Sequence, residues 1–66
     1  MWTVVYIAPT KAVADRIKDA LSIEGLLVQL RAIGLPQAGE NSSVEILVPE
    51  SEVDEAMEII NSSSLR

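Results

Sequence analysis

The chain has 66 residues, with ten acidic side chains against five basic ones, no cysteine and no histidine. This composition excludes disulfides, zinc sites of the Cys/His kind and nucleophiles that need a histidine base, and the net charge of −5 argues against nucleic-acid binding. A chain this short buries only about 60% of its unfolded surface, so association with a second chain is the stabilising device that remains.

The first elements are a strand and a helix. A strand is predicted over residues 3–7, which are β-branched or aromatic, and Pro9 ends it. A helix follows over about 11–24, with Thr10 as its N-cap. Gly25 stands where the residue after a helix adopts a positive φ. Apolar residues recur along this helix at helical period: Val13, Ile17, Ala20 and Leu21.

Two more strands are predicted over residues 26–31 and 44–48, because apolar and other side chains alternate there. Residues 32–43 between them are expected to form a loop. A second helix is predicted after Pro49, with Ser51 as N-cap and Asp54 completing a near capping box. The apolar stripe of this second helix is Val53, Ala56, Met57 and Ile60.

The order β-α-β-β-α predicts an α+β two-layer sandwich that is ferredoxin-like but lacks the last strand. The third strand fits between the other two and antiparallel to both, giving the sheet order 2-3-1. We expect one domain over 1–66, with an ordered core at about 2–61 and a frayed tail at 62–66. Both helices should cover one face of the sheet, made of Val5, Ile7, Leu26, Val28, Leu30, Val44, Ile46 and Val48.

The opposite face of the sheet is expected to be bare and mostly apolar. Monomers rarely show so apolar a patch, and the first strand is also an edge without a protective charge. We therefore expect a homo-oligomer, formed through sheet faces or by pairing of first strands; the alternative is a monomer with an apolar surface. The bare face should carry Trp2, Val4, Tyr6, Leu27, Gln29, Arg31, Glu45 and Leu47. The interface candidates among them are Trp2, Val4, Tyr6, Leu27 and Leu47.

A ligand could bind at the loop over 32–43, where glycines permit close backbone approach and polar groups follow. The loop is neither a P-loop nor a dinucleotide fingerprint, and a plain hairpin connection is the alternative. Arg31 is expected to pair with Glu45 across the ladder rather than to anchor a ligand. The ligand-binding candidates are Gly34, Gly39, Glu40, Asn41, Ser42 and Arg31.

No catalytic residue, metal or cofactor is expected. Lys11 and Lys18 lie on the polar side of the first helix, where an ammonium stays protonated and forms no Schiff base. The carboxylates near the second helix are expected to be solvated charges that suit a helix N-terminus, rather than a weak divalent-metal site. They are Glu50, Glu52, Asp54, Glu55 and Glu58.

The chain shows no basic segment with a cleavage site at its N-terminus and no apolar run near the ~20 residues of a membrane span. We expect a soluble, cytoplasmic protein without nucleic-acid or membrane partners.

The pattern over residues 3–60 resembles a family of short bacterial proteins described as signal-transducing proteins of unknown function. The matching positions are Tyr6, Ala8, Pro9, Gly25, Val48, Pro49 and Ala56. The resemblance implies a place near the PII and ACT-like regulatory folds, which oligomerise and bind small effectors. The nucleotide-binding loop of PII proteins is not recognisable here. Relatives are sometimes labelled glutamate decarboxylase, but a pyridoxal-phosphate enzyme needs a buried lysine and a phosphate cradle.

The sequence thus predicts a non-catalytic regulatory or adaptor module that oligomerises and binds a protein or small metabolite. Two alternatives stay open. One is a small enzyme or enzyme subunit that completes its site with a partner chain, and the other is a purely structural accessory subunit.

Overall fold

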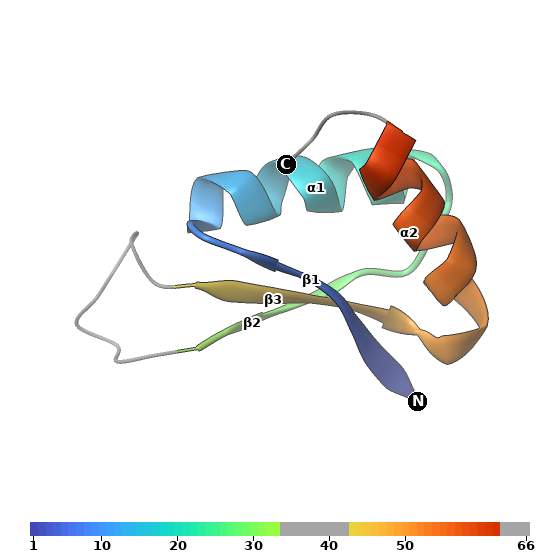
Figure 1. Cartoon of the computed structure of the whole chain (residues 1–66), viewed down its shortest axis with the longest axis horizontal. Helices are drawn as coiled ribbons and strands as arrows, with labels where there is room; N and C mark the ends of the chain where they lie inside the picture. Colours follow the sequence, from blue (N-terminus) through green and yellow to red (C-terminus); the bar gives the residue numbers. More distant parts are fainter. Residues whose placement is uncertain (34–42, 63–66) are drawn as a thin grey trace.

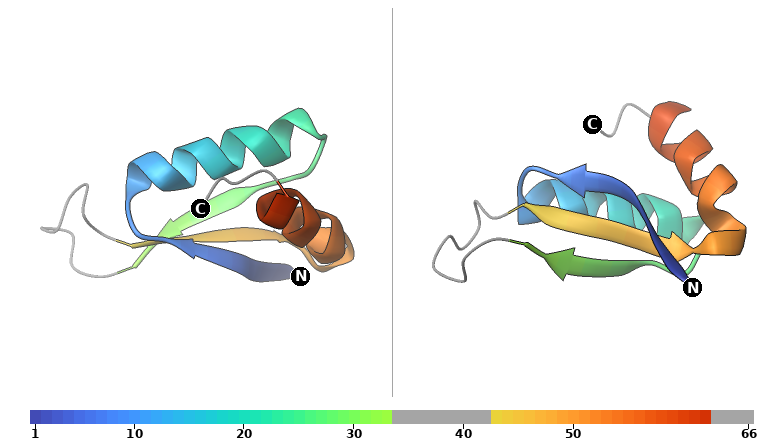
Figure 2. Two further views of the ribbon diagram at one scale, coloured as in Figure 1. Left: turned by 45° about the horizontal axis from the view of Figure 1, so that its top comes forward. Right: turned by 60° about the horizontal axis from the view of Figure 1, so that its bottom comes forward.

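The computed structural model of the chain describes residues 1–33 and 43–62. Three strands form one antiparallel sheet in the order β1-β3-β2. Both helices lie on the same side of this sheet (Figures 1 and 2). The α+β class and the strand order expected from the sequence are confirmed. The elements are β1 (Trp2–Ala8), α1 (Lys11–Ile23), β2 (Gln29–Ala32), β3 (Val44–Pro49), the short 3-10 helix η2 (Glu50–Glu52) and α2 (Val53–Ser62).

Helix α1 begins and ends as its sequence predicts. The Thr10 hydroxyl accepts a hydrogen bond from the Val13 N–H at 3.3 Å, which satisfies one of the free donors of the first turn. At the other end, Gly25 has φ +90° and its N–H donates to the carbonyl of Ser22 at 2.9 Å. The Leu26 N–H donates to the carbonyl of Leu21 at 3.1 Å. These two bonds make a Schellman motif.

The Schellman motif also turns the chain back to the sheet. Leu21, in the last turn of α1, and Leu26, just after the motif, are both buried in the core. A hydrophobic contact between these two positions commonly accompanies the motif. Gly25 therefore reverses the direction of the chain between α1 and β2, the strand that follows it.

The core lies between the helices and one face of the sheet. β3 is the central strand, and its Val44, Ile46 and Val48 are buried as predicted. Ile17 and Leu21 of α1 cover them without any exposed surface of their own. The remaining buried members of this core are Val5, Ala8, Ala14, Leu26, Ala56 and Ile60.

β2 begins at Gln29, not at residue 26 as predicted. The Ile33 N–H donates to the Ser43 carbonyl, so residues 33 and 43 form a hydrogen-bonded pair of the ladder. Such pairs recur at every second residue, and Gln29 opposite Leu47 is therefore another one. The next hydrogen-bonded pair would set residue 27 opposite Pro49, which has no N–H to donate. The ladder therefore stops there.

The N–H of Leu27 finds another partner, because it donates to Glu52 Oε1 at 3.0 Å. This bond joins the turn before α2 to the segment that leads into β2, across 25 positions of sequence. Glu52 thus accepts a structural hydrogen bond in addition to being one of the acidic residues around the start of α2. The sequence pattern does not indicate this hydrogen bond.

Replacing Glu52 by alanine should lower the free energy of unfolding by about 0.5–1.5 kcal/mol, because the Leu27 N–H then loses its acceptor. Glu52→Gln keeps an oxygen at this position and should lose much less. Urea unfolding followed by circular dichroism measures both. Glu55→Ala, which removes an exposed carboxylate from the next turn, is the control. An equal loss in that variant would trace the effect to charge rather than to the hydrogen bond.

The start of the second helix also differs from the expectation. Ser51 lies inside η2 rather than at an N-cap, so the proposed capping box with Asp54 is wrong. The Glu50 N–H donates to the Met1 carbonyl at 2.8 Å, so the hydrogen bonds to the β1 side of the sheet continue as far as the first residue of η2. Only residues up to Ser62 of the predicted tail are described, and Ser62 itself ends α2; residues 63–66 lie outside the described part.

β1 contains an irregularity that changes which side chains it shows on each face. Val4 lies opposite Leu47, and the next paired residue, opposite Ile46, is Tyr6. Val5 is the additional residue of a β-bulge. One extra residue reverses the alternation of all residues beyond it.

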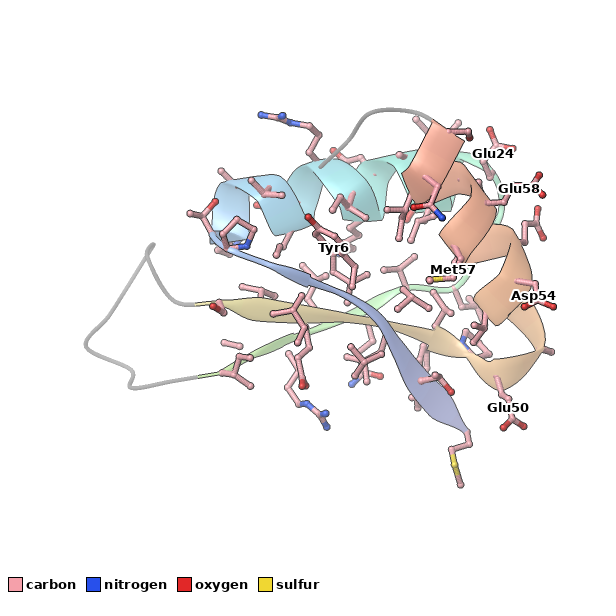
Figure 3. All side chains as sticks on the ribbon, viewed as in Figure 1. Tyr6, Glu24, Glu50, Asp54, Met57 and Glu58 are labelled. Carbon is pink, nitrogen blue, oxygen red and sulfur yellow. The ribbon has the colours of Figure 1, made fainter. Side chains whose placement is uncertain are left out.

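The bulge overturns two expected placements. Tyr6 was expected on the bare face, but it pairs with the buried Ile46 and packs partly buried against the core. Its side chain projects from β1 towards the helix layer (Figure 3). Ile7 was expected in the core, but it pairs with Glu45 and is exposed.

Candidate functional site

The face of the sheet opposite the helices carries three cross-strand rows. Trp2 pairs with Pro49 in the first, Val4 with Leu47 and Leu47 with Gln29 in the second, and Ile7 with Glu45 and Glu45 with Arg31 in the third. We call this surface the open face. It consists of Trp2, Val4, Ile7, Gln29, Arg31, Glu45, Leu47 and Pro49, with Leu27 just before β2.

The open face is apolar where β1 and residue 27 contribute to it. The exposed fractions are 46% for Trp2, 38% for Val4, 52% for Ile7 and 62% for Leu27. Leu47 in the middle is only 5% exposed, since residues of both neighbouring strands flank it. The structure thus places four of the five interface candidates on this face, one of them already covered, and moves Tyr6 to the other side.

Ile7 belongs to this surface although the sequence analysis missed it. Every residue of β1 is apolar or weakly polar, WTVVYIA. No charged residue in the strand fixes which side chains face water, so a bulge cannot be read from the pattern.

The pairing of Arg31 with Glu45 is confirmed. Arg31 Nε donates to Glu45 Oε1 at 2.6 Å, and Nη2 lies 2.6 Å from the same oxygen. The Arg31 side chain is 60% exposed and that of Glu45 is 17% exposed. The pair neutralises the two charges that the open face contains, and it leaves one edge of the guanidinium towards solvent.

The Arg31–Glu45 pair should contribute a coupling energy of about 0.2–1 kcal/mol to stability, since a cross-strand ion pair open to water is weak. A double-mutant cycle with Arg31→Ala, Glu45→Ala and the combined variant measures it from urea unfolding. Adding about 1 M salt should reduce the coupling. A coupling well above this range would show that water is excluded from the pair, as it would be in an interface.

The candidate loop joins two neighbouring antiparallel strands. Ala32 pairs with Val44, and the Ile33 N–H donates to the Ser43 carbonyl at 2.9 Å, so the two ends of the loop meet. Arg31 stands two residues before this closing bond. The other ligand candidates lie outside the described residues: Gly34, Gly39, Glu40, Asn41 and Ser42.

Acidic side chains gather at one end of the molecule. Figure 3 shows Glu24, Glu58, Asp54 and Glu50 spread along the same side of the molecule, from the end of α1 past α2 to η2. Within residues 1–33 and 43–62, no group of three or more carboxylates has the geometry to hold a metal ion. These charges form an acidic surface around the start of α2.

Three of the five basic residues lie on the other helix, α1. Lys11 Nζ is 3.0 Å from Asp15 Oδ2, one turn further along α1, and both side chains are at least half exposed. Arg16 and Lys18 are exposed as well. The two helices therefore differ in charge, since α1 carries three basic residues and η2 with α2 carries none.

The described part of the chain contains no pocket. Neither of its helices has the length and apolar character needed to span a membrane. Comparison with models of protein families, with curated protein sequences and with solved structures gave no match.

Proposed function

We propose that this chain is a non-catalytic regulatory or adaptor module that works by associating with other copies of itself and by binding a protein or a small metabolite. The observation that carries the proposal is the apolar part of the open face on β1, where Trp2, Val4 and Ile7 are exposed on a strand at the edge of the sheet. A surface of this kind marks an interaction site more often than it occurs on a stable monomer.

The size of the chain supports association. Sixty-six residues without cysteine or histidine have neither disulfides nor a Cys/His metal site to add to a small core. Burying exposed apolar side chains of β1 against another chain adds about 25 cal/mol of stabilisation per Å² of apolar surface removed from water. The ferredoxin-like description of the fold and the resemblance to short bacterial signal-transducing proteins agree with this proposal, since the related regulatory folds act as oligomers.

If the proposal holds, the melting temperature should rise with protein concentration, because association stabilises only the folded chain. Differential scanning calorimetry from low to high micromolar concentration measures this dependence, and sedimentation velocity gives the mass at the same concentrations. A single species of 7.1 kDa with a constant melting temperature over that range would refute association.

An anionic metabolite is the effector that the open face suits best. The exposed edge of the Arg31 guanidinium can donate to a carboxylate or phosphate while Glu45 holds the other edge. A ligand at 100 times its Kd should add about 2.7 kcal/mol of stability, which for a domain of this size raises the melting temperature by more than about 10 °C. A thermal-shift screen of organic acids and nucleotides measures the effect, with Arg31→Gln as control. An equal shift in that variant would place the ligand elsewhere.

A further inference from the structure

We propose that the free edge of β1 is the site of self-association, where it pairs antiparallel with β1 of a second copy to form one continuous sheet twice as wide. This inference rests on the proposed function and names the surface that mediates it. Among the described residues β1 pairs with β3 alone, so its other edge offers unpaired backbone groups.

The direction of these backbone groups follows from the pairing at the start of β1. The carbonyl of Met1 accepts from the Glu50 N–H and so points towards β3. Successive residues of a strand point their backbone groups to opposite sides. The N–H and C=O of Trp2 and Val4 therefore point away from β3, to the free edge, where a second strand can bond to them.

Of the two described edge strands in this acidic molecule, β1 is the one without a charged side chain. Two chains with a net charge of −5 each repel one another. β1 has no charged residue over its seven positions, whereas β2, the other edge strand, has four residues and contains Arg31. Pairing along β1 therefore brings no like-charged side chains of the two strands together.

Antiparallel pairing also sets opposite charges near one another. The acidic η2 and α2 begin at the N-terminal end of β1, where the Glu50 N–H donates to the Met1 carbonyl. Helix α1, with three basic and two acidic residues, begins at the C-terminal end of β1. An antiparallel partner places the start of its α1 beside the acidic end of the first copy. Parallel pairing would instead set the two acidic helices next to each other.

Apolar side chains line the same border. Trp2, Val4 and Ile7 of β1 are exposed on the open face. Antiparallel pairing brings Trp2 towards the end of the partner strand that carries Ile7. Cross-strand pairs of aromatic and β-branched residues stabilise such a ladder.

The bulge at Val5 limits the strength of this contact. Bulges twist an edge and interrupt its hydrogen bonds, and a strand of seven residues offers less contact than a standard interface of about 800 Å² per partner. We therefore expect a reversible dimer that dissociates on dilution. Trp2 is the only tryptophan, so its emission should shift to the blue as the dimer forms.

Three variants test the pairing by sedimentation velocity and tryptophan emission. Val4→Pro removes an N–H that points to the free edge, and Val4→Lys places a charge on the open face of the strand that forms this edge. Leu27→Lys places the same charge on the open face beyond β2, away from the β1 edge. Circular dichroism checks that each variant is folded; if Val4→Pro is not, Val4→Lys decides.

The wild type should reach twice 7.1 kDa at high micromolar concentration. Both Val4 variants should raise the dissociation constant at least about tenfold, and Leu27→Lys should leave it within about twofold of the wild type. Loss of the dimer in Leu27→Lys, or its retention in the Val4 variants, would overturn edge pairing and leave the proposed function standing. A wild type that stays monomeric would overturn both.

Discussion

Replacing Ile46 by alanine should remove about 2–5 kcal/mol from the free energy of unfolding. Ile46 lies in the central strand, has no exposed surface, and pairs with Tyr6 on one side and Leu30 on the other. The loss combines the transfer free energy of the deleted carbons with the cavity that a small core cannot refill. Urea unfolding at one fixed protein concentration measures it, since association adds to apparent stability.

This loss is large relative to the whole stability of the domain. At about 0.05–0.15 kcal/mol per residue, a chain of 66 residues has roughly 3–10 kcal/mol in total. Ile46→Ala should therefore be partly or wholly unfolded at 37 °C. Ile23→Ala is the matched control, because Ile23 is 82% exposed at the end of α1, and it should change stability by no more than about 0.5 kcal/mol. Similar losses in both variants would contradict the position of the core.

Replacing Gly25 by alanine should cost about 1–2 kcal/mol, since an L-residue with a side chain is strained at φ +90°. A Cβ built at this position meets no heavy atom within 4 Å. The expected loss therefore comes from the backbone alone and not from a clash. Thermal unfolding should show a fall of about 4–8 °C per kcal/mol lost in a domain of this size.

Asparagine provides the control for Gly25, because it adopts left-handed backbone conformations more readily than alanine. Gly25→Asn should lie between the wild type and Gly25→Ala in stability. If the free energy of unfolding falls equally in Gly25→Ala and Gly25→Asn, the positive φ at the end of α1 is not the cause of the loss.

The sequence predicts those elements whose ends carry local signals. Thr10 and Gly25 bracket α1 because one satisfies a backbone donor and the other adopts a conformation that side chains disfavour. In β3, Glu45 marks the side of the strand that faces water, so Ile46 and Val48 were correctly assigned to the core. The strand order followed from how these elements can pack.

The errors occur where tertiary contacts decide. Nothing in β1 marks its outer side, so the bulge at Val5 and the exchange of Tyr6 with Ile7 could not be predicted. β2 starts late because Pro49, on another strand, cannot continue the ladder, and Glu52 takes the Leu27 N–H instead. The sequence predicted that one face of the sheet is open, but the extra residue of the bulge decides which side chains of β1 lie on that face.

The bulge also affects how related chains should be aligned. A relative that lacks a counterpart of Val5 would keep Val4 opposite Leu47 and Tyr6 opposite Ile46, with the same outward side chains. A one-residue gap at the bulge therefore keeps the pairing of β1, whereas a gap within β3 would turn the inward residues beyond it to the other face of the sheet. Related chains with and without a residue at position 5 should therefore present the same side chains on the open face.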